Sequence, residues 1–113
     1  MAALATCDNV CVKLGGLAMK VNGFGWHTRD KPPTSEALAN ATAPYYQYCI
    51  EVFGADRCMF ESNFPVEKLS VSYGALWNSF KRISAGCSDR ERAALFHDTA
   101  QRVYRLPGQA ARA

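Results

Sequence analysis

Two polar residues that can do chemistry follow a short apolar run near the middle of the chain. Glu61 ends the run Arg57-Cys58-Met59-Phe60-Glu61, and Asn63 comes two residues later. Because side chains alternate along a strand, we predict that Glu61 and Asn63 project together at its end. Glu61 would act as an acid, a base or a ligand, and Asn63 would be its orienting hydrogen-bond partner, since an amide takes up no proton near neutral pH. A turn in which Asn63 only satisfies local backbone groups explains the two residues equally well.

Three other side chains are candidates for contact with a substrate. Lys13 lies inside an earlier apolar run, residues 9–14. A cation in such a run either reaches toward one end of the fold or pairs with a carboxylate such as Glu61. Trp26 and His27 lie in residues 15–33, a long stretch rich in glycine and proline. Stretches of this length without regular structure are usually functional or disordered. His27 would contact a substrate or transfer a proton, and the alternative is that Trp26 and His27 form a partly buried packing pair.

The spacing of apolar residues predicts short strands between longer helices. Thr34 or Ser35 would cap the longest helix, and Pro44 inside it predicts a kink or a restart. Ser88 and Glu91 have the spacing of a capping box. In chain order we expect a helix end at 2–5, a strand at 9–14, a loop at 15–33, a helix at 34–53, a strand at 57–61, a helix at 73–85 and further helices over 88–106.

Two short apolar strands joined by a helix are typical of a parallel βαβ unit in an α/β fold. A parallel sheet needs cover on both faces, and two strands alone cannot satisfy that requirement. The outer edges of the strands at 9–14 and 57–61 would also carry unpaired backbone groups. The pattern therefore requires more strands than the chain contains. In such folds, function gathers in the loops that follow the carboxyl ends of the strands.

Composition excludes several classes of protein. The chain has 113 residues, a net charge of +3 and 49% hydrophobic residues, and no apolar run approaches the roughly 18 residues of a membrane span. Residues 1–20 lack the pattern of an export signal, and the odd number of cysteines predicts reduced thiols in the cytoplasm. The mild positive charge, without interleaved aromatic residues, predicts no nucleic-acid partner. Pro107-Gly108 should end the last helix, which leaves residues 107–113 as a frayed tail.

Three segments together resemble a known family. They are Val10–Gly16, Phe53–Pro65 and Asp98–Leu106, the last of which is similar to a closing helix that usually reads Asn-Ala-x-x-x-Tyr-x-Leu. The segments resemble the C-terminal part of the amidohydrolase-related (amidohydrolase 2) family, TIM-barrel hydrolases and decarboxylases that include lactonases acting on dicarboxylates. The resemblance implies that residues 1–106 are a partial barrel domain, the last two βα units and closing helices of a TIM barrel. The chain would be a fragment, roughly a quarter to a third of a barrel of about 250 residues.

The resemblance also implies roles for the site residues. The family's motif is usually Ser-Asp-x-Pro, whose aspartate binds metal or activates water, and Asn63 stands at the position of that aspartate. Glu61 is then a candidate to supply the missing carboxylate. The family's His-x-His is absent, so we expect no complete metal site in this chain, and a divalent metal such as zinc only in a full-length parent. The parent would cleave a C–O, C–N or C–C bond in a small, carboxylated molecule, with Trp26 and His27 shaping its pocket, and the isolated chain would be inactive.

A second hypothesis is a non-enzymatic interaction module. Its exposed strand edges would pair with a partner chain or with a second copy of the same chain. Such a module would self-associate, whereas a monomer that melts cooperatively would count against it.

Overall fold

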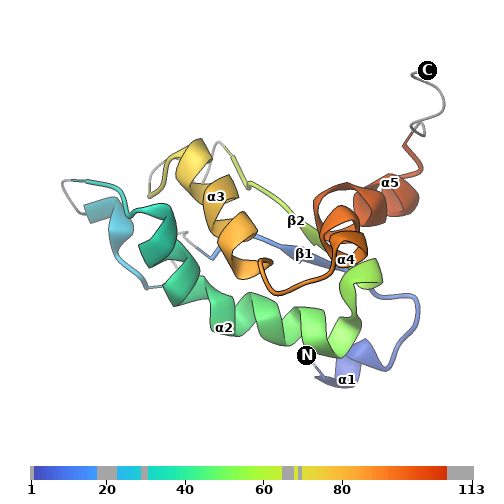
Figure 1. Ribbon diagram of the computed structural model, residues 1–113. Coiled ribbons are helices and arrows are strands. Elements are labelled where there is room, and N and C mark those ends of the chain that lie inside the picture. Colours follow the sequence, from blue (N-terminus) through green and yellow to red (C-terminus); the bar gives the residue numbers. More distant parts are fainter. Residues whose placement is uncertain (1, 18–22, 29–30, 65–67, 69, 107–113) are drawn as a thin grey trace, which may run out of the picture.

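A computed structural model describes residues 2–17, 23–28, 31–64, 68 and 70–106 of the chain (Figure 1). The tail predicted at residues 107–113 lies outside the described residues, as does part of the loop predicted at 15–33. In chain order the elements are α1 (Ala2–Ala5), β1 (Val12–Leu14), the 3-10 turn η2 (Trp26–Thr28), α2 (Ser35–Phe53), the 3-10 turn η3 (Ala55–Arg57), β2 (Cys58–Phe60), α3 (Tyr73–Ile83), α4 (Asp89–Ala93), the π-helical segment η5 (Ala94–Asp98) and α5 (Thr99–Tyr104).

β1 and β2 form a parallel two-stranded sheet in which Leu14 lies opposite Phe60. Since α2 joins the two strands, the predicted βαβ arrangement is confirmed. β1 is shorter than the strand predicted at 9–14. The Val10 N–H donates to the Cys7 carbonyl oxygen at 3.2 Å, so a turn uses a backbone group that a longer strand would need.

α2 begins and ends at its capping residues. The Thr34 hydroxyl accepts a backbone N–H of the first turn at 3.1 Å, and the Gly54 N–H, in a residue with a φ of 83°, donates to a carbonyl of the last turn at 2.8 Å. The predicted restart at Pro44 is wrong, because α2 runs unbroken through it. Pro44 is exposed, so water can reach the carbonyl group that the missing proline N–H leaves without a donor.

The C-terminal helices follow one another with almost no break. α4 starts with the capping box predicted for Ser88 and Glu91, and η5 and α5 continue from it. α5 ends at Tyr104 because Arg105 adopts the left-handed backbone conformation, with a φ of 56°. The helical run therefore ends earlier than the predicted stop at Pro107.

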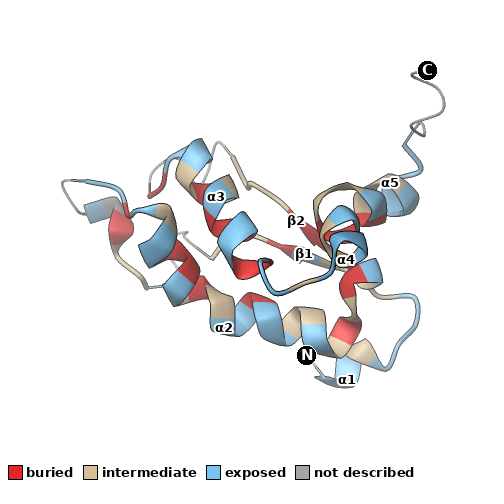
Figure 2. Cartoon of the chain, viewed as in Figure 1, coloured by how far each residue is buried: buried red, intermediate tan, exposed pale blue. Residues whose placement is uncertain are grey.

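The core lies between the sheet and the helices that cover one of its faces. The ring of Phe60 in β2 stacks on Phe80 of α3 at 4.4 Å and meets Phe96 of η5 at 4.9 Å. Figure 2 shows the buried residues gathered where α2, α3 and the C-terminal helices face the strands. Since side chains alternate along a strand, the opposite face of the sheet carries Lys13 and Glu61.

Arg57 ties the start of the chain to the βαβ unit. Its guanidinium donates to the carbonyl oxygens of Phe53 at 3.1 Å, Cys7 at 2.9 Å and Ala5 at 2.8 Å. These carbonyls lie at or just beyond the C-terminal ends of α1 and α2, where helices leave acceptors without an internal donor. One side chain therefore satisfies acceptors at two helix ends.

Two features bear on the predictions from composition. The five cysteines are free thiols, of which Cys58 is buried while Cys7 and Cys11 are exposed. Within the described part of the chain, no helix is both long enough and apolar enough to cross a membrane.

Candidate functional site

The carboxyl ends of β1 and β2 lie at the same edge of the sheet because the strands are parallel (Figure 1). At that edge the Nζ atom of Lys13 lies 3.1 Å from Oε2 of Glu61. The Glu61 side chain is 27% exposed and that of Lys13 is 51% exposed, so the salt bridge is within reach of solvent. The predicted pairing of Lys13 with Glu61 is confirmed.

The register of the strands explains this contact. Lys13 lies opposite Met59, so Glu61 stands two residues further along the same face of the sheet. The Glu61 N–H donates to the Leu14 carbonyl oxygen at 3.1 Å, which holds the chain beyond β2 against β1. Gly15 permits this close approach, because a Cβ atom there would lie 2.4 Å from Cγ and 2.5 Å from the carbonyl oxygen of Glu61.

The electrostatics of the pair assign a charge state to Lys13. Its pKa is raised above the ordinary value by the hydrogen bond to Glu61, then by the Glu61 charge, and further by Tyr104. The Lys13 ammonium lies 6.0 Å from the ring centroid of Tyr104 in α5. Lys13 therefore stays protonated at neutral pH, and its amine is not available to attack a carbonyl group. Its partner Glu61 presents a carboxylate, which can accept hydrogen bonds or a proton.

Asn63 lies beyond β2, and its backbone conformation is not that of a strand. β2 ends at Phe60, and Asn63 has a φ of 54°, in the left-handed region that asparagine tolerates better than most residues. The Phe64 N–H donates to the Ser62 hydroxyl at 3.3 Å, which fixes the turn around Asn63. The alternation expected to bring Glu61 and Asn63 together therefore stops before it reaches Asn63. The backbone matches the alternative interpretation, a turn that ends the strand.

Trp26 is placed by packing. Its side chain is 6% exposed, and its ring stacks on Phe24 with centroids 4.7 Å apart and planes inclined by 8°. Trp26 therefore packs in a stacked pair with Phe24, and the predicted packing pair of Trp26 with His27 stays a prediction. The backbone of His27 lies in the same turn, η2, and its side chain lies outside what the structure describes.

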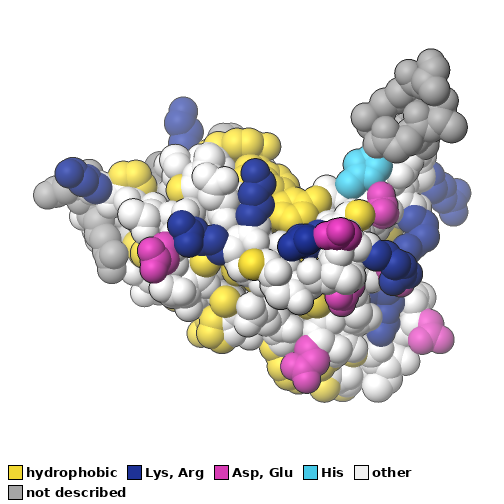
Figure 3. All heavy atoms as spheres, viewed as in Figure 1, with side chains coloured by type: hydrophobic (Ala, Val, Ile, Leu, Met, Phe, Trp, Pro, Cys, Tyr) yellow, Lys and Arg dark blue, Asp and Glu magenta, His cyan; other side chains and the backbone are white. Residues whose placement is uncertain are grey.

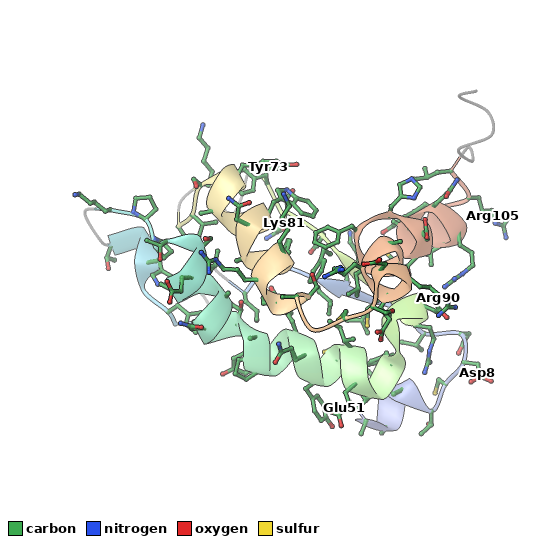
Figure 4. The ribbon with its side chains drawn as sticks, viewed as in Figure 1. Asp8, Glu51, Tyr73, Lys81, Arg90 and Arg105 are labelled. Carbon is green, nitrogen blue, oxygen red and sulfur yellow. The ribbon has the colours of Figure 1, made fainter. Side chains whose placement is uncertain are left out.

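An aromatic cluster beside the strand ends was not singled out from the sequence. Phe64 meets Tyr73 edge to face at 5.2 Å, and Tyr73 and Phe96 each lie 6.0 Å from Trp77. Tyr73 is 55% exposed at the start of α3 (Figure 4), and no group in the described part of the chain accepts a hydrogen bond from the buried Nε1 atom of Trp77. The spacing of Tyr73, Trp77 and Phe80 was the available signal, but it predicts a helix face and no cluster.

The described residues do not fit a metal ion. They contain no group of three or more His, Cys, Asp or Glu side chains placed to share one. The Glu61 carboxylate is paired with Lys13, and Asn63 offers an amide oxygen, which is a weak ligand for zinc. The described part of the chain therefore supports no step that passes through a metal.

A cavity of about 250 Å³ lies elsewhere, between α2 and the turn after α3. Figure 4 labels Glu51, one of its lining residues, on the part of α2 remote from Tyr73. The cavity is lined by Gln47, Ile50, Glu51, Ile83, Gly86 and Cys87. None of these is a residue of the strand ends, so the cavity does not enlarge the site around Glu61.

The relationship to known proteins follows from a protein-family model. The amidohydrolase model Amidohydro_2 matches residues 1–106. The chain belongs to this amidohydrolase family. The family predicted from the segments around Val10–Gly16, Phe53–Pro65 and Asp98–Leu106 is therefore confirmed.

Two curated proteins are similar to this amidohydrolase chain. The uncharacterized protein y4mH of Sinorhizobium fredii is 46% identical over 106 residues, which are 94% of this chain and 31% of y4mH. The L-fucono-1,5-lactonase of Burkholderia multivorans is 32% identical over 106 residues, which are 92% of this chain and 33% of the lactonase. This chain therefore spans about a third of the length of the curated relatives it matches.

This chain also covers about a third of the length of two solved structures. A crystal structure of an amidohydrolase from Burkholderia multivorans with bound zinc matches with a TM-score of 0.78 and 29% identity, over 94% of this chain and 35% of that chain. A crystal structure from Pseudomonas putida, described as a 2-pyrone-4,6-dicarboxylic acid hydrolase, matches with a TM-score of 0.63 and 25% identity, over 96% and 37% of the two chains. The described chain is thus a mixed α/β segment that matches about a third of amidohydrolase TIM-barrel structures.

Proposed function

We propose that this chain is the C-terminal third of an amidohydrolase-type TIM-barrel hydrolase, with Glu61 at its catalytic face. β1 and β2 would be the last two barrel strands, and α3 to α5 would close the barrel. The observation that carries the proposal is the salt bridge of 3.1 Å between Lys13 and Glu61 at the carboxyl ends of two parallel strands. TIM barrels place their active sites at that end of the strands.

The names of two relatives narrow the bond that the whole enzyme would cleave. The Burkholderia relative is an L-fucono-1,5-lactonase, and the Pseudomonas structure is described as a hydrolase of 2-pyrone-4,6-dicarboxylic acid. Both compounds are cyclic esters. Among C–O, C–N and C–C bonds, we therefore favour the C–O bond of a small lactone or carboxylated cyclic ester. Water would add to the ester carbonyl, and the ring would open to a carboxylate and a hydroxyl group.

The residues of this chain would take distinct parts in that reaction. Glu61 would accept a proton from the attacking water, because it presents a carboxylate at the strand ends. Lys13 would hold that carboxylate in place and remain charged. Asn63 would donate a hydrogen bond from its amide to the water or to the substrate. Trp26 is buried, so it would support the pocket from beneath, and His27 stays the candidate for direct contact with the substrate.

The isolated chain would not catalyse the reaction. It covers 31–33% of its curated relatives, so most of the wall of any barrel must come from residues that it does not contain. Its described residues also form no metal site. Activity would therefore require a second polypeptide segment that supplies roughly the other two thirds of a barrel.

A fusion tests the proposal. This chain would replace the matching third of the Burkholderia lactonase, and hydrolysis of L-fucono-1,5-lactone would be followed by titration of the released acid. We expect hydrolysis by this joined protein and none by the chain alone or by the lactonase without its matching third. If the joined protein does not fold, the same exchange is made in y4mH, the relative with 46% identity. That protein is then assayed with a panel of small lactones. A folded joined protein that hydrolyses no lactone, or an isolated chain as active as the joined one, would refute the proposal.

A further inference from the structure

The cavity of about 250 Å³ between α2 and the turn after α3 has no part in the proposed function. Ile50 of α2 and Ile83 at the end of α3 give it apolar walls, and Cys87 adds a half-buried thiol. Apolar walls with a few polar groups are the usual form of a small-molecule site. The volume equals that of about eight water molecules at ~30 Å³ each, so it suits a molecule smaller than a typical drug.

The two polar side chains of α2 at the cavity offer hydrogen-bond acceptors. Gln47 and Glu51 are four residues apart, so they lie on the same face of the helix. The Gln47 amide nitrogen donates to the Ile83 carbonyl oxygen at 3.2 Å, and its amide oxygen can accept a hydrogen bond. Glu51 is exposed, so it presents a carboxylate at the rim. None of the described residues that line the cavity is a cation.

The surroundings of the cavity favour positive charge. α3 ends at Ile83, so carbonyl groups with partial negative charge lie beside the cavity. The pKa of the Cys87 thiol is raised by burial and then by the Glu91 carboxylate, and the lowering effect of Arg92 is smaller than either. The charge of Glu91 therefore outweighs that of Arg92 at this wall of the cavity.

The basic side chains near the end of α3 are directed elsewhere. Arg82 donates to the Ser35 hydroxyl at 3.0 Å, at the first residue of α2, whereas the α2 residues of the cavity belong to the last two turns of that helix. Figure 3 shows Lys and Arg side chains over α3 and the C-terminal helices, while the visible side chains along the later part of α2 are hydrophobic, acidic or uncharged. The cavity therefore complements an apolar molecule with a positive charge.

Gly86 leaves one side of the cavity open. A Cβ atom at Gly86 would meet nothing within 4 Å, and its φ lies outside the left-handed region that favours glycine. Neither a close approach nor the backbone conformation therefore requires glycine at this position. A larger side chain there would occupy part of the cavity.

We propose that this cavity binds a small organic cation, a primary alkylammonium ion whose hydrocarbon chain lies between Ile50 and Ile83. Its ammonium group donates hydrogen bonds to the Glu51 carboxylate and to the Gln47 amide oxygen, and an ammonium group has three donors for such acceptors. The chain gains from leaving water for the apolar walls. Every residue that takes part belongs to this chain, so the binding does not rest on the proposed function.

Titration of the 15N-labelled chain with n-hexylamine, which is protonated at neutral pH, tests the proposal at low ionic strength. Hexan-1-ol and hexanoate have chains of the same length, without charge and with negative charge. We expect saturable shifts of the Gly86 and Cys87 backbone amides and of the Gln47 side-chain amide. Hexylammonium should bind at least about fivefold more tightly than hexanoate, with hexan-1-ol between them.

Matched variants locate the binding. Glu51→Gln should weaken hexylammonium binding at least about threefold and leave hexan-1-ol unchanged, because it removes only the charge. Glu36→Gln is the control, since Glu36 is an exposed acid of the same helix that lies in its first turn. Gly86→Leu should abolish the binding of both compounds, because its side chain fills the cavity. Gly74→Leu is its control, since a Cβ atom at Gly74 in α3 also meets nothing within 4 Å and Gly74 does not line the cavity.

A second measurement covers the case in which Gly86→Leu does not fold. Hexylammonium should slow the alkylation of Cys87 by iodoacetamide at least about threefold and leave the exposed Cys7 unchanged, as mass spectrometry of the two peptides measures. If the chain alone does not fold, the alkylation is measured in the joined protein, which contains the same cavity residues, whether or not it hydrolyses a lactone.

Three results would overturn the proposal. The first is equal affinity for hexylammonium and hexanoate, which would leave an apolar cavity without preference for a cation. The second is an equal effect of Glu51→Gln and Glu36→Gln, or an alkylation of Cys87 that hexylammonium does not slow. The third is self-association that covers Cys87 in the absence of ligand, which would make a second copy of the chain the occupant.

Discussion

Lys13 of β1 and Glu61, just beyond β2, are joined by a salt bridge of 3.1 Å that depends on the parallel register of the two strands. Lys13 lies opposite Met59, so Glu61 follows two positions later on the same face. A slip of the register by one residue would move Lys13 to the face that packs against the helices. The pairing is therefore a property of the folded βαβ unit, and several predictions depend on it.

The first prediction concerns the titration of Lys13. Its pKa in the folded chain should exceed the ordinary value of 10.5, and Glu61→Gln should lower it toward that value, because Glu61 is the main cause of the shift. A raised pKa means that the pair stabilises the fold below about pH 10.5 and that this contribution is lost as the pH rises through the pKa of the folded state. The side chain is half exposed, so the contribution should stay below ~1 kcal/mol. NMR titration of the lysine side chain measures the shift, and an unchanged Lys13 pKa in the variant would argue against the pair.

Gly15 should not tolerate a side chain. In Gly15→Ala the new Cβ would lie 2.4 Å from Cγ of Glu61, so the variant must push Glu61 away from β1. We expect a loss of about 1–3 kcal/mol in the free energy of unfolding, the usual cost of overpacking. Gly74→Ala is the matched control, because a Cβ at Gly74 in α3 meets nothing within 4 Å. It should stabilise the chain by up to ~1 kcal/mol through helix propensity. Urea denaturation checks both, and equal effects of the two variants would count against the close approach at Gly15.

Arg57 should matter more to stability than a surface arginine. Arg57→Met removes hydrogen bonds to the carbonyls of Phe53, Cys7 and Ala5 and should cost about 2–4 kcal/mol. Arg90→Met is the control, because the Arg90 salt bridge to Asp56 is exposed and should contribute under ~1 kcal/mol. Thermal melting of both variants measures the difference. If the two melt alike, Arg57 does not hold the start of the chain as the structure indicates.

Asn63 should accept glycine more readily than alanine. Its φ of 54° lies in the left-handed region, where the Cβ atom of most residues meets the backbone and glycine, which has no Cβ, is favoured. Both variants lose the amide and only alanine adds a Cβ atom, so Asn63→Ala should be less stable than Asn63→Gly by about 1 kcal/mol in the free energy of unfolding. Denaturation curves of the two variants test this order, and a glycine variant less stable than the alanine variant would contradict it. Asn63→Gly is consequently the cleaner variant with which to remove the amide from the proposed site.

Local signals in the sequence were enough to predict most helices. Thr34 and Ser88 are capping residues whose hydroxyls accept backbone N–H groups of the first turn, and the helices begin where these residues stand. Pro44 misled because proline disfavours a helix interior in general, yet here it is exposed on a long helix whose other side packs on the core.

Long-range geometry was only partly accessible from the sequence. The pairing of Lys13 with Glu61 was one of two predicted alternatives, since a buried strand offers a cation few places to go. The turn at Asn63 was also one of two predicted alternatives. The other extended strand alternation past Phe60, the last residue of β2, and the left-handed backbone at Asn63 ends that alternation. The aromatic cluster was missed because Phe64, Trp77 and Phe96 come from three separate segments that only tertiary packing brings together.

The most direct test of the central claim is the turnover rate of the joined protein with and without the Glu61 carboxylate. Glu61→Gln keeps the size and polarity of the side chain but cannot accept a proton. The account predicts that this variant folds with nearly the same melting temperature and hydrolyses the lactone with a kcat lower by at least about 100-fold. A Glu61→Gln protein that keeps the parental kcat would contradict it.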